Sequence, residues 1–194
     1  MDFRRIEYLK DGTPRQRVVY DCLCKYGILS SLSDFDPVVV STICLDVDID
    51  SSDIDVVCYA KYLSEFKSRV LSIFGKFPGF CQHERVRPYP AVIASFRVDS
   101  FEVEIFGVAV PVEKQDAYRH LSVLARLIEV GGEEFRDEIR RLKVSGLKTE
   151  PAIAESLNLS GNPYAAVLEL ESLGDIALRI LLAEGFRKKV PCTK

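Results

Sequence analysis

The chain has 194 residues, of which 47% are hydrophobic and 28% charged, and its formal net charge is −3. This length and composition are typical of one globular domain, or of one domain with a helical extension, that buries a core without covalent cross-links. The slightly acidic balance does not favour a protein that binds duplex nucleic acid or a membrane surface.

Two further classes are excluded by the pattern of apolar residues. No apolar run approaches the roughly 18 residues that a membrane-spanning helix needs, and no apolar segment follows the charged residues 1–5 as it would in a secretory signal. Six cysteines are present, and four lie in apolar segments, where a free thiol behaves as a small hydrophobic side chain. We therefore expect a reducing, cytoplasmic location.

The first half of the chain is predicted to mix helices and strands. Thr13, Pro14 and Gln16 form a helix start, with Thr13 as the N-cap and Gln16 completing a capping box. Predicted strands cover residues 38–42, 53–59, 80–87, 91–98 and 100–106, and a predicted helix covers 63–74. The last two strands are separated by a short turn, which predicts a hairpin.

After residue 112 the pattern becomes helical. Predicted helices cover residues 115–130, 133–144, 150–157 and 162–186, separated by glycines, with Thr149 as the N-cap of the third helix. We expect an α+β fold in which residues 1–112 form a mixed sheet with flanking helices. Residues 113–194 are expected to form a helical region packed against that domain.

Two carboxylates, Asp53 and Asp55, lie two positions apart in a β-branched run, so they share one face of a predicted strand with Cα atoms about 6.5 Å apart. Both can reach one divalent ion, or a pair of ions about 4 Å apart. A neighbouring strand should supply a third carboxylate, with Glu104 as the first choice and Glu102 as the second. The alternative is that Asp53 caps a turn and both glutamates face water.

Basic residues alternate on one face of the predicted strand 80–87, where His83, Arg85 and Arg87 are spaced two apart, and Arg97 lies on the next strand. This pattern indicates either a basic wall for an anionic ligand or a solvated edge that discourages pairing between sheets.

The stretch Ser41-Thr42, ten further residues and Asp53-Ile54-Asp55-Val56 resembles the signature of the polymerase-β-like nucleotidyltransferase superfamily. In that signature a Gly-Ser or Gly-Thr turn precedes an Asp-x-Asp pair and a later third acid. Most of residues 1–165 also resemble a family of uncharacterised bacterial proteins with this fold, on residues 52–55, 101–107, 115–120 and 142–151. The resemblance implies a nucleotidyltransferase-like fold, catalytic and metal-binding roles for Asp53, Asp55 and Glu104 with Mg²⁺ or Mn²⁺, and phosphate contacts around Ser41, Thr42 and Ser52.

Two basic residues of the second half are candidates for further phosphate contacts. Arg119 lies near the start of a predicted helix just after the strand of Glu104, and it is suited either to clamp a phosphate or to remain a surface arginine. Lys148 lies in a basic patch that the usual charge distribution along a helix explains equally well.

These features predict metal-dependent transfer of a nucleoside monophosphate from a nucleoside triphosphate to an unknown acceptor. However, Ser41 stands where the superfamily has a glycine that lets the backbone approach the phosphates. The alternative is therefore a catalytically inactive module that binds a nucleotide or a partner on a degenerate transferase scaffold. Hydrolysis of a phosphoester by the same metals would need a water-positioning base, which the sequence does not identify.

Overall fold

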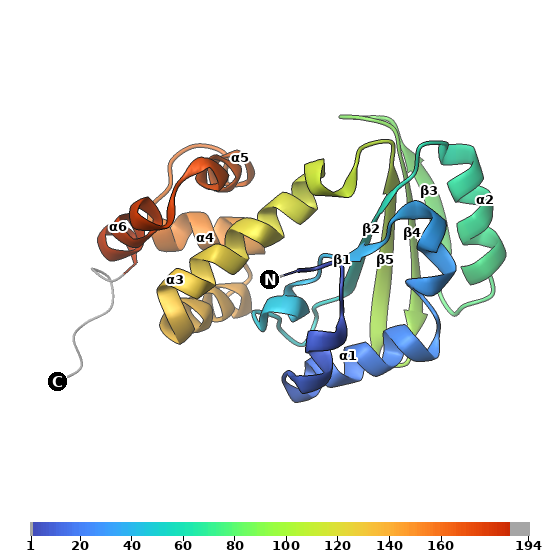
Figure 1. Ribbon diagram of the computed structural model, residues 1–194, viewed down its shortest axis with the longest axis horizontal. Helices are drawn as coiled ribbons and strands as arrows, with labels where there is room; N and C mark the ends of the chain where they lie inside the picture. The colour runs from blue at the N-terminus through green and yellow to red at the C-terminus, as the bar shows by residue number, and fades with distance from the viewer. Residues whose placement is uncertain (1, 187–194) are drawn as a thin grey trace. The chain divides into compact units, whose positions relative to one another are not determined.

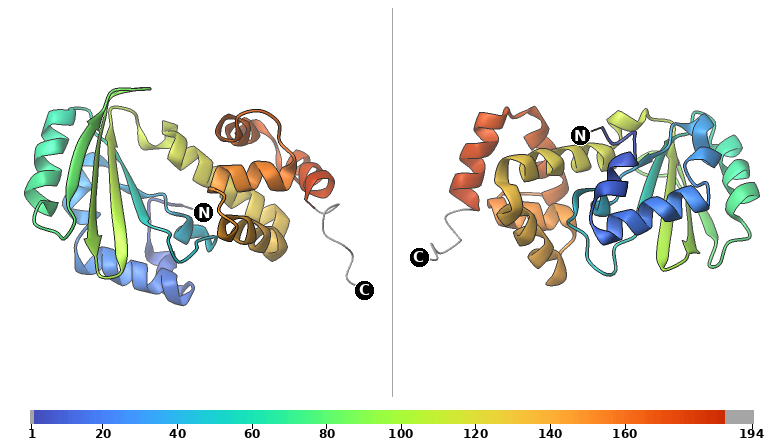
Figure 2. Two further views of the ribbon diagram at one scale, coloured as in Figure 1. Left: turned by 180° about the vertical axis from the view of Figure 1, so that it is seen from behind. Right: turned by 60° about the horizontal axis from the view of Figure 1, so that its bottom comes forward.

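The computed structural model describes residues 2–186, so Cys192 lies outside the described part. The chain forms two compact units (Figures 1 and 2), one of residues 1–46 and 51–118 and the other of residues 47–50 and 119–194. The first unit is a five-stranded mixed sheet with helices, and the second unit is largely helical. The predicted α+β fold class is confirmed.

The elements of the first unit are, in chain order, η1 (Glu7–Asp11), α1 (Pro14–Lys25), η2 (Ser30–Phe35), β1 (Val38–Val39), η3 (Thr42–Leu45), β2 (Ile54–Tyr59), α2 (Leu63–Phe74), β3 (Cys81–Arg85), β4 (Ala91–Val98), β5 (Phe101–Val108) and η4 (Val112–Lys114), where η denotes a 3₁₀-helix. The strand order is β1-β2-β5-β4-β3. Strands β2 and β5 are parallel, and the other three pairs are antiparallel.

Helix α1 begins as its sequence predicts. The Thr13 hydroxyl accepts a hydrogen bond from the backbone N–H of Gln16, and the Gln16 side chain accepts one from the backbone N–H of Thr13. Each bond satisfies a donor that would otherwise have no partner at the helix start. The amide of Gln16 also donates to the carbonyls of Ile43 and Cys44, at 2.8 and 3.3 Å, so α1 is joined to η3.

Helix α2 covers one face of the sheet. The fully buried Phe66 lies so close to Gly107 on β5 that a Cβ atom there would be 2.1 Å from the ring. Phe74, near the end of the same helix, stacks on Phe96 of β4 with ring centroids 4.7 Å apart. Gly107, near the end of β5, therefore lets the helix pack directly against the strand.

The predicted strand over residues 38–42 is shorter than expected, since β1 contains only Val38 and Val39. The chain turns because the Ser41 side chain accepts a hydrogen bond from the N–H of Ile43 and caps the 3₁₀-helix η3. A serine hydroxyl can end a β-strand in this way, because it offers a nearby backbone N–H a hydrogen-bond partner other than the neighbouring strand.

The second unit contains α3 (Asp116–Val144), of which residues from 119 onward belong to this unit, followed by α4 (Thr149–Leu157), α5 (Pro163–Glu169), η5 (Leu170–Ser172) and α6 (Asp175–Gly185). Gly132 has φ 73°, so the predicted break after residue 130 is present as a local departure from helical geometry. Among the described residues, every helix is too short or too polar to span a bilayer.

Two predictions for the second unit were wrong. Residues 162–186 form separate helices because the chain is extended at Leu173 and Gly174, and Arg126 donates to the carbonyls of Glu171 and Leu173 at this break. Thr149 is the first residue of α4 and not its N-cap. The N–H of Ala152 bonds to the carbonyl of Lys148, which makes Lys148 the cap.

Candidate metal centre

Three carboxylates meet on one face of the sheet, where the start of β2 lies beside the middle of β5. Asp53 directly precedes β2, Asp55 lies on β2, and Glu104 lies on β5 as the register partner of Asp55. Each side chain offers one oxygen, and the three oxygens all lie within 4.8 Å of one another; all three residues are partly exposed. Glu102, the second choice, is exposed and is not part of this cluster.

The cluster has the chemistry of a site for a hard cation. When ionised, carboxylates at this separation repel each other by about 1 to 3 kcal/mol for each pair at a partly exposed site. A divalent cation removes that repulsion, and Mg²⁺ and Mn²⁺ prefer oxygen ligands of this kind. Three carboxylates leave coordination positions for water or for phosphate oxygens, so the residues present fit such an ion.

Ser41 holds the backbone that carries the two aspartates. Its buried hydroxyl donates to the carbonyl oxygen of Asp53 at 2.6 Å, and the N–H of Val40 donates to the carbonyl of Asp55 at 2.9 Å. Both bonds use only the backbone carbonyls of Asp53 and Asp55, so neither bond occupies a carboxylate. Ser41 thus supports the backbone of the Asp-x-Asp segment.

Helix α1 supports the same segment through Arg15. The Arg15 guanidinium donates to the carbonyl of Ser52 at 3.1 Å and lies 5.2 Å from the centre of the Phe101 ring. It therefore connects the residue before Asp53 to the start of β5. Sequence reasoning did not identify this role, because an arginine in a predicted helix gives no local signal of its partners.

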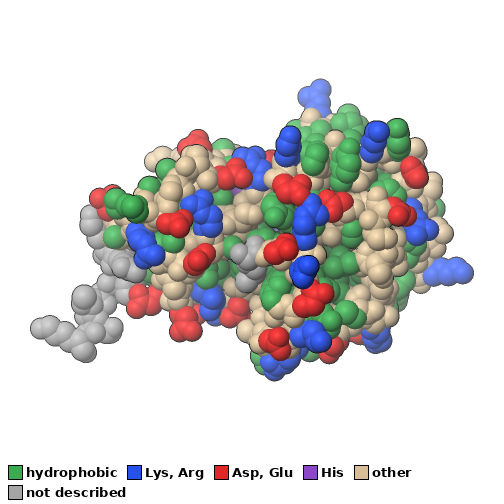
Figure 3. Space-filling view, in the orientation of Figure 1, with side chains coloured by type: hydrophobic (Ala, Val, Ile, Leu, Met, Phe, Trp, Pro, Cys, Tyr) green, Lys and Arg blue, Asp and Glu red, His purple; other side chains and the backbone are tan. Residues whose placement is uncertain are grey.

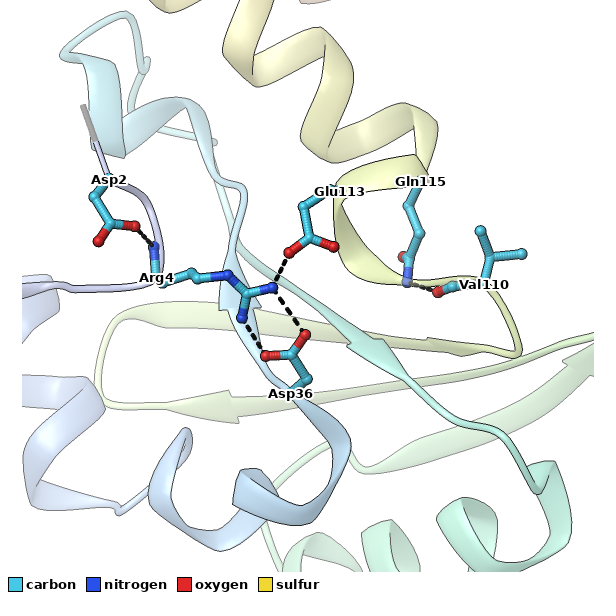
Figure 4. Close-up of polar contacts among 6 residues, drawn as sticks. All are labelled: Asp2, Arg4, Asp36, Val110, Glu113 and Gln115. Carbon is cyan, nitrogen blue, oxygen red and sulfur yellow. Dashed lines mark hydrogen bonds and ion pairs between the residues drawn. The ribbon is translucent and has the colours of Figure 1, made fainter.

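A second polar cluster in this unit also escaped sequence reasoning (Figure 4). The Arg4 guanidinium binds the carboxylates of Asp36 and Glu113, which belong to segments far apart in the chain. The hydrogen bond from Arg4 lowers the pKa of Glu113. Gln115, two residues after Glu113, is buried. Its side-chain amide donates to the carbonyls of Cys58 and Val110, at 3.1 and 2.9 Å. These contacts fix the segment between β5 and α3.

The remaining predicted site residues lie in different surroundings. Thr42 begins η3, next to Ser41, and Ser52 directly precedes Asp53, so both are adjacent in sequence to residues of the carboxylate segment. In the second unit, the Arg119 guanidinium binds the Glu171 carboxylate through Nε and an Nη atom, at 2.9 and 2.7 Å. Lys148 is the exposed cap residue of α4.

His120 also has protein partners. Its Nε2 lies 2.9 Å from the carbonyl oxygen of Tyr164, and its Nδ1 lies 3.4 Å from a carboxylate oxygen of Glu150. These contacts give the imidazole a structural role in the second unit.

On the face drawn in Figure 3, acidic and basic side chains are mixed, in agreement with the small net charge of −3.

Comparisons with known proteins agree with this fold. A family model described as a domain of unknown function (DUF4269) matches residues 21–170. No curated protein sequence matches the chain. Among solved structures, the poly(A) polymerase complex of GLD-2 with GLD-3 aligns with a TM-score of 0.52 and 17% identity, over 98% of this chain and 67% of that chain. The complex of GLD-2 with RNP-8 aligns with a TM-score of 0.49 and 16% identity, over 96% of this chain and 74% of that one. At such identities the first likeness shows a nucleotidyltransferase-like fold alone.

Proposed function

Because the chain belongs to the family described as a domain of unknown function (DUF4269), we infer its activity from the carboxylate cluster and propose a metal-dependent nucleotidyltransferase. The proposed enzyme transfers a nucleoside monophosphate from a nucleoside triphosphate to a hydroxyl group of an acceptor. The observation that carries this proposal is the convergence of Asp53, Asp55 and Glu104 within 4.8 Å on a nucleotidyltransferase-like sheet.

The three acids have distinct proposed roles. Asp53 and Asp55 hold Mg²⁺ or Mn²⁺, and Glu104 completes the ligand set and accepts the proton of the acceptor hydroxyl. When bound, the ions neutralise charge on the phosphates and lower the pKa of the acceptor hydroxyl. Because Asp55 and Glu104 are opposite each other on adjacent strands, the sheet fixes their separation before any ligand binds, which favours catalysis.

The proposed reaction balances without any further reactant. The acceptor oxygen forms a bond to the α-phosphorus of the triphosphate while the bond from that phosphorus to the β-phosphate oxygen breaks. Pyrophosphate leaves with the electron pair of the broken bond, and the proton of the acceptor hydroxyl passes to Glu104. The products are pyrophosphate and the acceptor with an attached nucleoside monophosphate.

The proposed phosphate contacts differ in kind. Thr42 and Ser52 flank the carboxylate segment in sequence, so we retain them as direct phosphate contacts, whereas Ser41 acts by positioning Asp53 through its buried hydroxyl. Arg119 and Lys148 remain candidate phosphate contacts. To bind the triphosphate, Arg119 would have to release its carboxylate partner Glu171. Glutamine substitutions at Arg119 and at Lys148 would test both contacts.

Calorimetry with Mn²⁺ and each of ATP, CTP, GTP and UTP tests the proposal. We expect at least one nucleotide to bind in a metal-dependent manner, and Asp53→Asn to abolish that binding. Glu102→Gln is the matched control, because Glu102 carries the same charge on β5 but lies outside the cluster. Failure of all four nucleotides to bind in the presence of metal contradicts the proposal.

A second candidate is a non-catalytic module that binds a nucleotide, and it is favoured by Ser41 at a position where the superfamily has glycine. The two candidates differ in the release of pyrophosphate. Incubation with α-labelled nucleotides and a mixture of candidate acceptors should yield labelled product and pyrophosphate if the protein is an enzyme. Binding of a nucleotide without either product, across a broad acceptor set, favours the second candidate.

A further inference from the structure

Basic side chains of β3 and β4 lie on the same face of the sheet as the carboxylate cluster. Directly opposite residues share a face, and the register places Cys81 opposite Ser95, which is in turn opposite Glu104. Side chains alternate between faces along a strand, so His83 and Arg85 share the face of Cys81, and Arg97 shares that of Ser95. All four strands β2, β5, β4 and β3 thus contribute charged residues to one surface.

The contacts of α2 identify this surface as the face that α2 leaves uncovered. The intervening residues of β3 are joined to α2, since Gln82 donates to the carbonyl of Lys67 at 3.1 Å and Glu84 binds the Lys67 ammonium at 2.6 Å. Gly107 faces Phe66 of the same helix. It lies three residues after Glu104 on β5, so Gly107 and Glu104 are on opposite faces of the sheet. His83 and Arg97 are exposed, and Arg85 is partly exposed.

Charge on the α2-free face is divided between its two halves. Glu102, Glu104 and Asp55 lie on β5 and β2, whereas Arg85 lies on β3 opposite Ala91, and Arg97 lies on β4 directly opposite Glu102. Among residues 2–186, His83, Arg85 and Arg97 have no carboxylate within ion-pair distance. Arg85 instead lies 5.9 Å from the ring of Tyr89, and its Nε–H is shielded from solvent without an acceptor.

We propose that His83 and Arg85 bind a phosphate group of the acceptor, so that the acceptor of the reaction proposed above is a small phosphorylated molecule; this inference rests on that proposed function. Strand geometry puts the Cα of Arg85 about 10 Å across and about 13 Å along the sheet from that of Glu104. One molecule of about the size of a mononucleotide spans that separation and leaves its hydroxyl at the carboxylates. The Arg85 guanidinium, whose Nε–H has no acceptor, is suited to a phosphate because a guanidinium can donate to two of its oxygens at once.

The size of the patch and the charge of the chain decide between a small molecule and a nucleic-acid strand. Polynucleotide binding depends on many cations along the phosphate backbone. Here the described strands β3 and β4 carry two guanidinium groups on this face, those of Arg85 and Arg97, and the net charge of the chain is −3. The phosphorylated small molecule therefore fits better, and a nucleic-acid strand becomes the outcome that the experiment must reject.

Alkylation of Cys81 reports directly on occupation of this face, because Cys81 is exposed and lies in the row of Ser95 and Glu104. The exposed Cys24 on α1 serves as the internal control. Ribose 5-phosphate, without metal or nucleotide, should protect Cys81 and not Cys24 from iodoacetamide, as measured by peptide mass spectrometry. Ribose should protect neither thiol. Equal protection of Cys81 by ribose and by its phosphate overturns the proposal.

Substitutions then assign the phosphate contact. Arg85→Gln should weaken the protection by ribose 5-phosphate about tenfold, since a charge-assisted contact is lost, whereas Arg85→Lys should retain most of it. Arg69→Gln removes an exposed cation from α2, so it should have no effect. A single-stranded oligonucleotide that protects Cys81 at much lower concentration than the sugar phosphate overturns the proposal. Asp55→Asn should leave protection intact, so loss of nucleotide binding and loss of phosphate binding are separate results.

Discussion

Asp55 on β2 and Glu104 on β5 lie directly opposite each other in a parallel strand pair, although α2, β3 and β4 separate them in the chain. This pairing brings the third carboxylate to the Asp-x-Asp segment. The backbone ladder between the two strands therefore fixes the distance between the proposed metal ligands. Only rotation of the Asp55 and Glu104 side chains is then needed to bring their carboxylate oxygens to a common ion.

The carboxylate cluster should make thermal stability depend on a divalent cation. We expect saturating Mn²⁺ to raise the melting temperature by about 5–10 °C, since a ligand at 100 times its Kd stabilises by about 2.7 kcal/mol. Glu104→Gln should abolish the metal-induced rise without lowering the stability of the metal-free protein, because it removes a repelling charge. Differential scanning fluorimetry measures both. The Glu102→Gln protein should behave as the wild type, and an unchanged metal response in Glu104→Gln would refute the assignment.

The buried hydroxyl of Ser41 should contribute to both stability and metal affinity. Ser41→Ala removes the hydrogen bond to the Asp53 carbonyl and the cap of η3, which should lower the free energy of unfolding by about 1–3 kcal/mol. Chemical denaturation measures this loss, and titration with Mn²⁺ should show weaker binding. Ser68→Ala is the control, because the exposed Ser68 hydroxyl only bonds back to the carbonyl of Ser64 within α2. Equal losses in both variants would contradict a special role for Ser41.

Gly107 should be intolerant of even a methyl group. The Cβ of an alanine would lie 2.1 Å from the fully buried ring of Phe66, and relief of such a clash typically costs about 1–3 kcal/mol or more. Denaturant unfolding of Gly107→Ala should show that loss. In the Gly107→Ala/Phe66→Leu double variant the added cost of the alanine should shrink, since the smaller side chain yields space. A cost of the alanine that is independent of residue 66 would show that the clash is not the cause.

Stability should fall in acid partly because of Glu113. Its hydrogen bond from Arg4 lowers its pKa in the folded protein below the ordinary 4.5. A carboxyl group with a lowered folded pKa stabilises the protein above its unfolded pKa, and that contribution is lost as the pH falls through the folded pKa. Glu113→Gln should therefore show a smaller decrease in melting temperature between pH 6 and pH 3 than the wild type. Asp21→Asn, at an exposed position of α1, should leave the decrease unchanged, and an identical decrease in all three proteins would exclude the Arg4 contact as its source.

The cysteines should divide into two classes by reactivity. Burial raises the pKa of the Cys22 and Cys44 thiols to about 11 and raises that of Cys58 further, so these thiols should react slowly because the thiolate is the nucleophile. The exposed Cys24 and Cys81 should react first at pH 8. Peptide mapping after timed alkylation measures each rate. Rapid alkylation of Cys44 in the folded protein would contradict its position in the core.

Much of the first unit could be predicted from sequence because its signals are local. The capping box at Thr13 and Gln16, the apolar stripe of α2 and the alternation along β4 and β5 each act within a few residues. The convergence of Asp53 and Asp55 with Glu104 was also expected, because alternation fixes which face each acid occupies. Their roles as metal ligands remain a prediction.

The features that could not be predicted depend on distant partners. The phosphate contact expected for Ser41 stays a prediction, whereas its hydrogen bond to the carbonyl of Asp53 across a loop was not anticipated. The continuous helix expected over residues 162–186 is broken where Arg126, on α3, satisfies the exposed carbonyls. Arg4 likewise bridges Asp36 and Glu113. No local pattern encodes such contacts, since each needs the folded chain to bring its partners together.

Anomalous diffraction from crystals soaked with Mn²⁺ and a non-hydrolysable nucleoside triphosphate tests the central claim most directly. The account predicts an anomalous peak bonded to carboxylate oxygens of Asp53, Asp55 and Glu104, with triphosphate oxygens completing its coordination. A nucleotide bound without metal at these residues, or a metal peak only elsewhere, would contradict it.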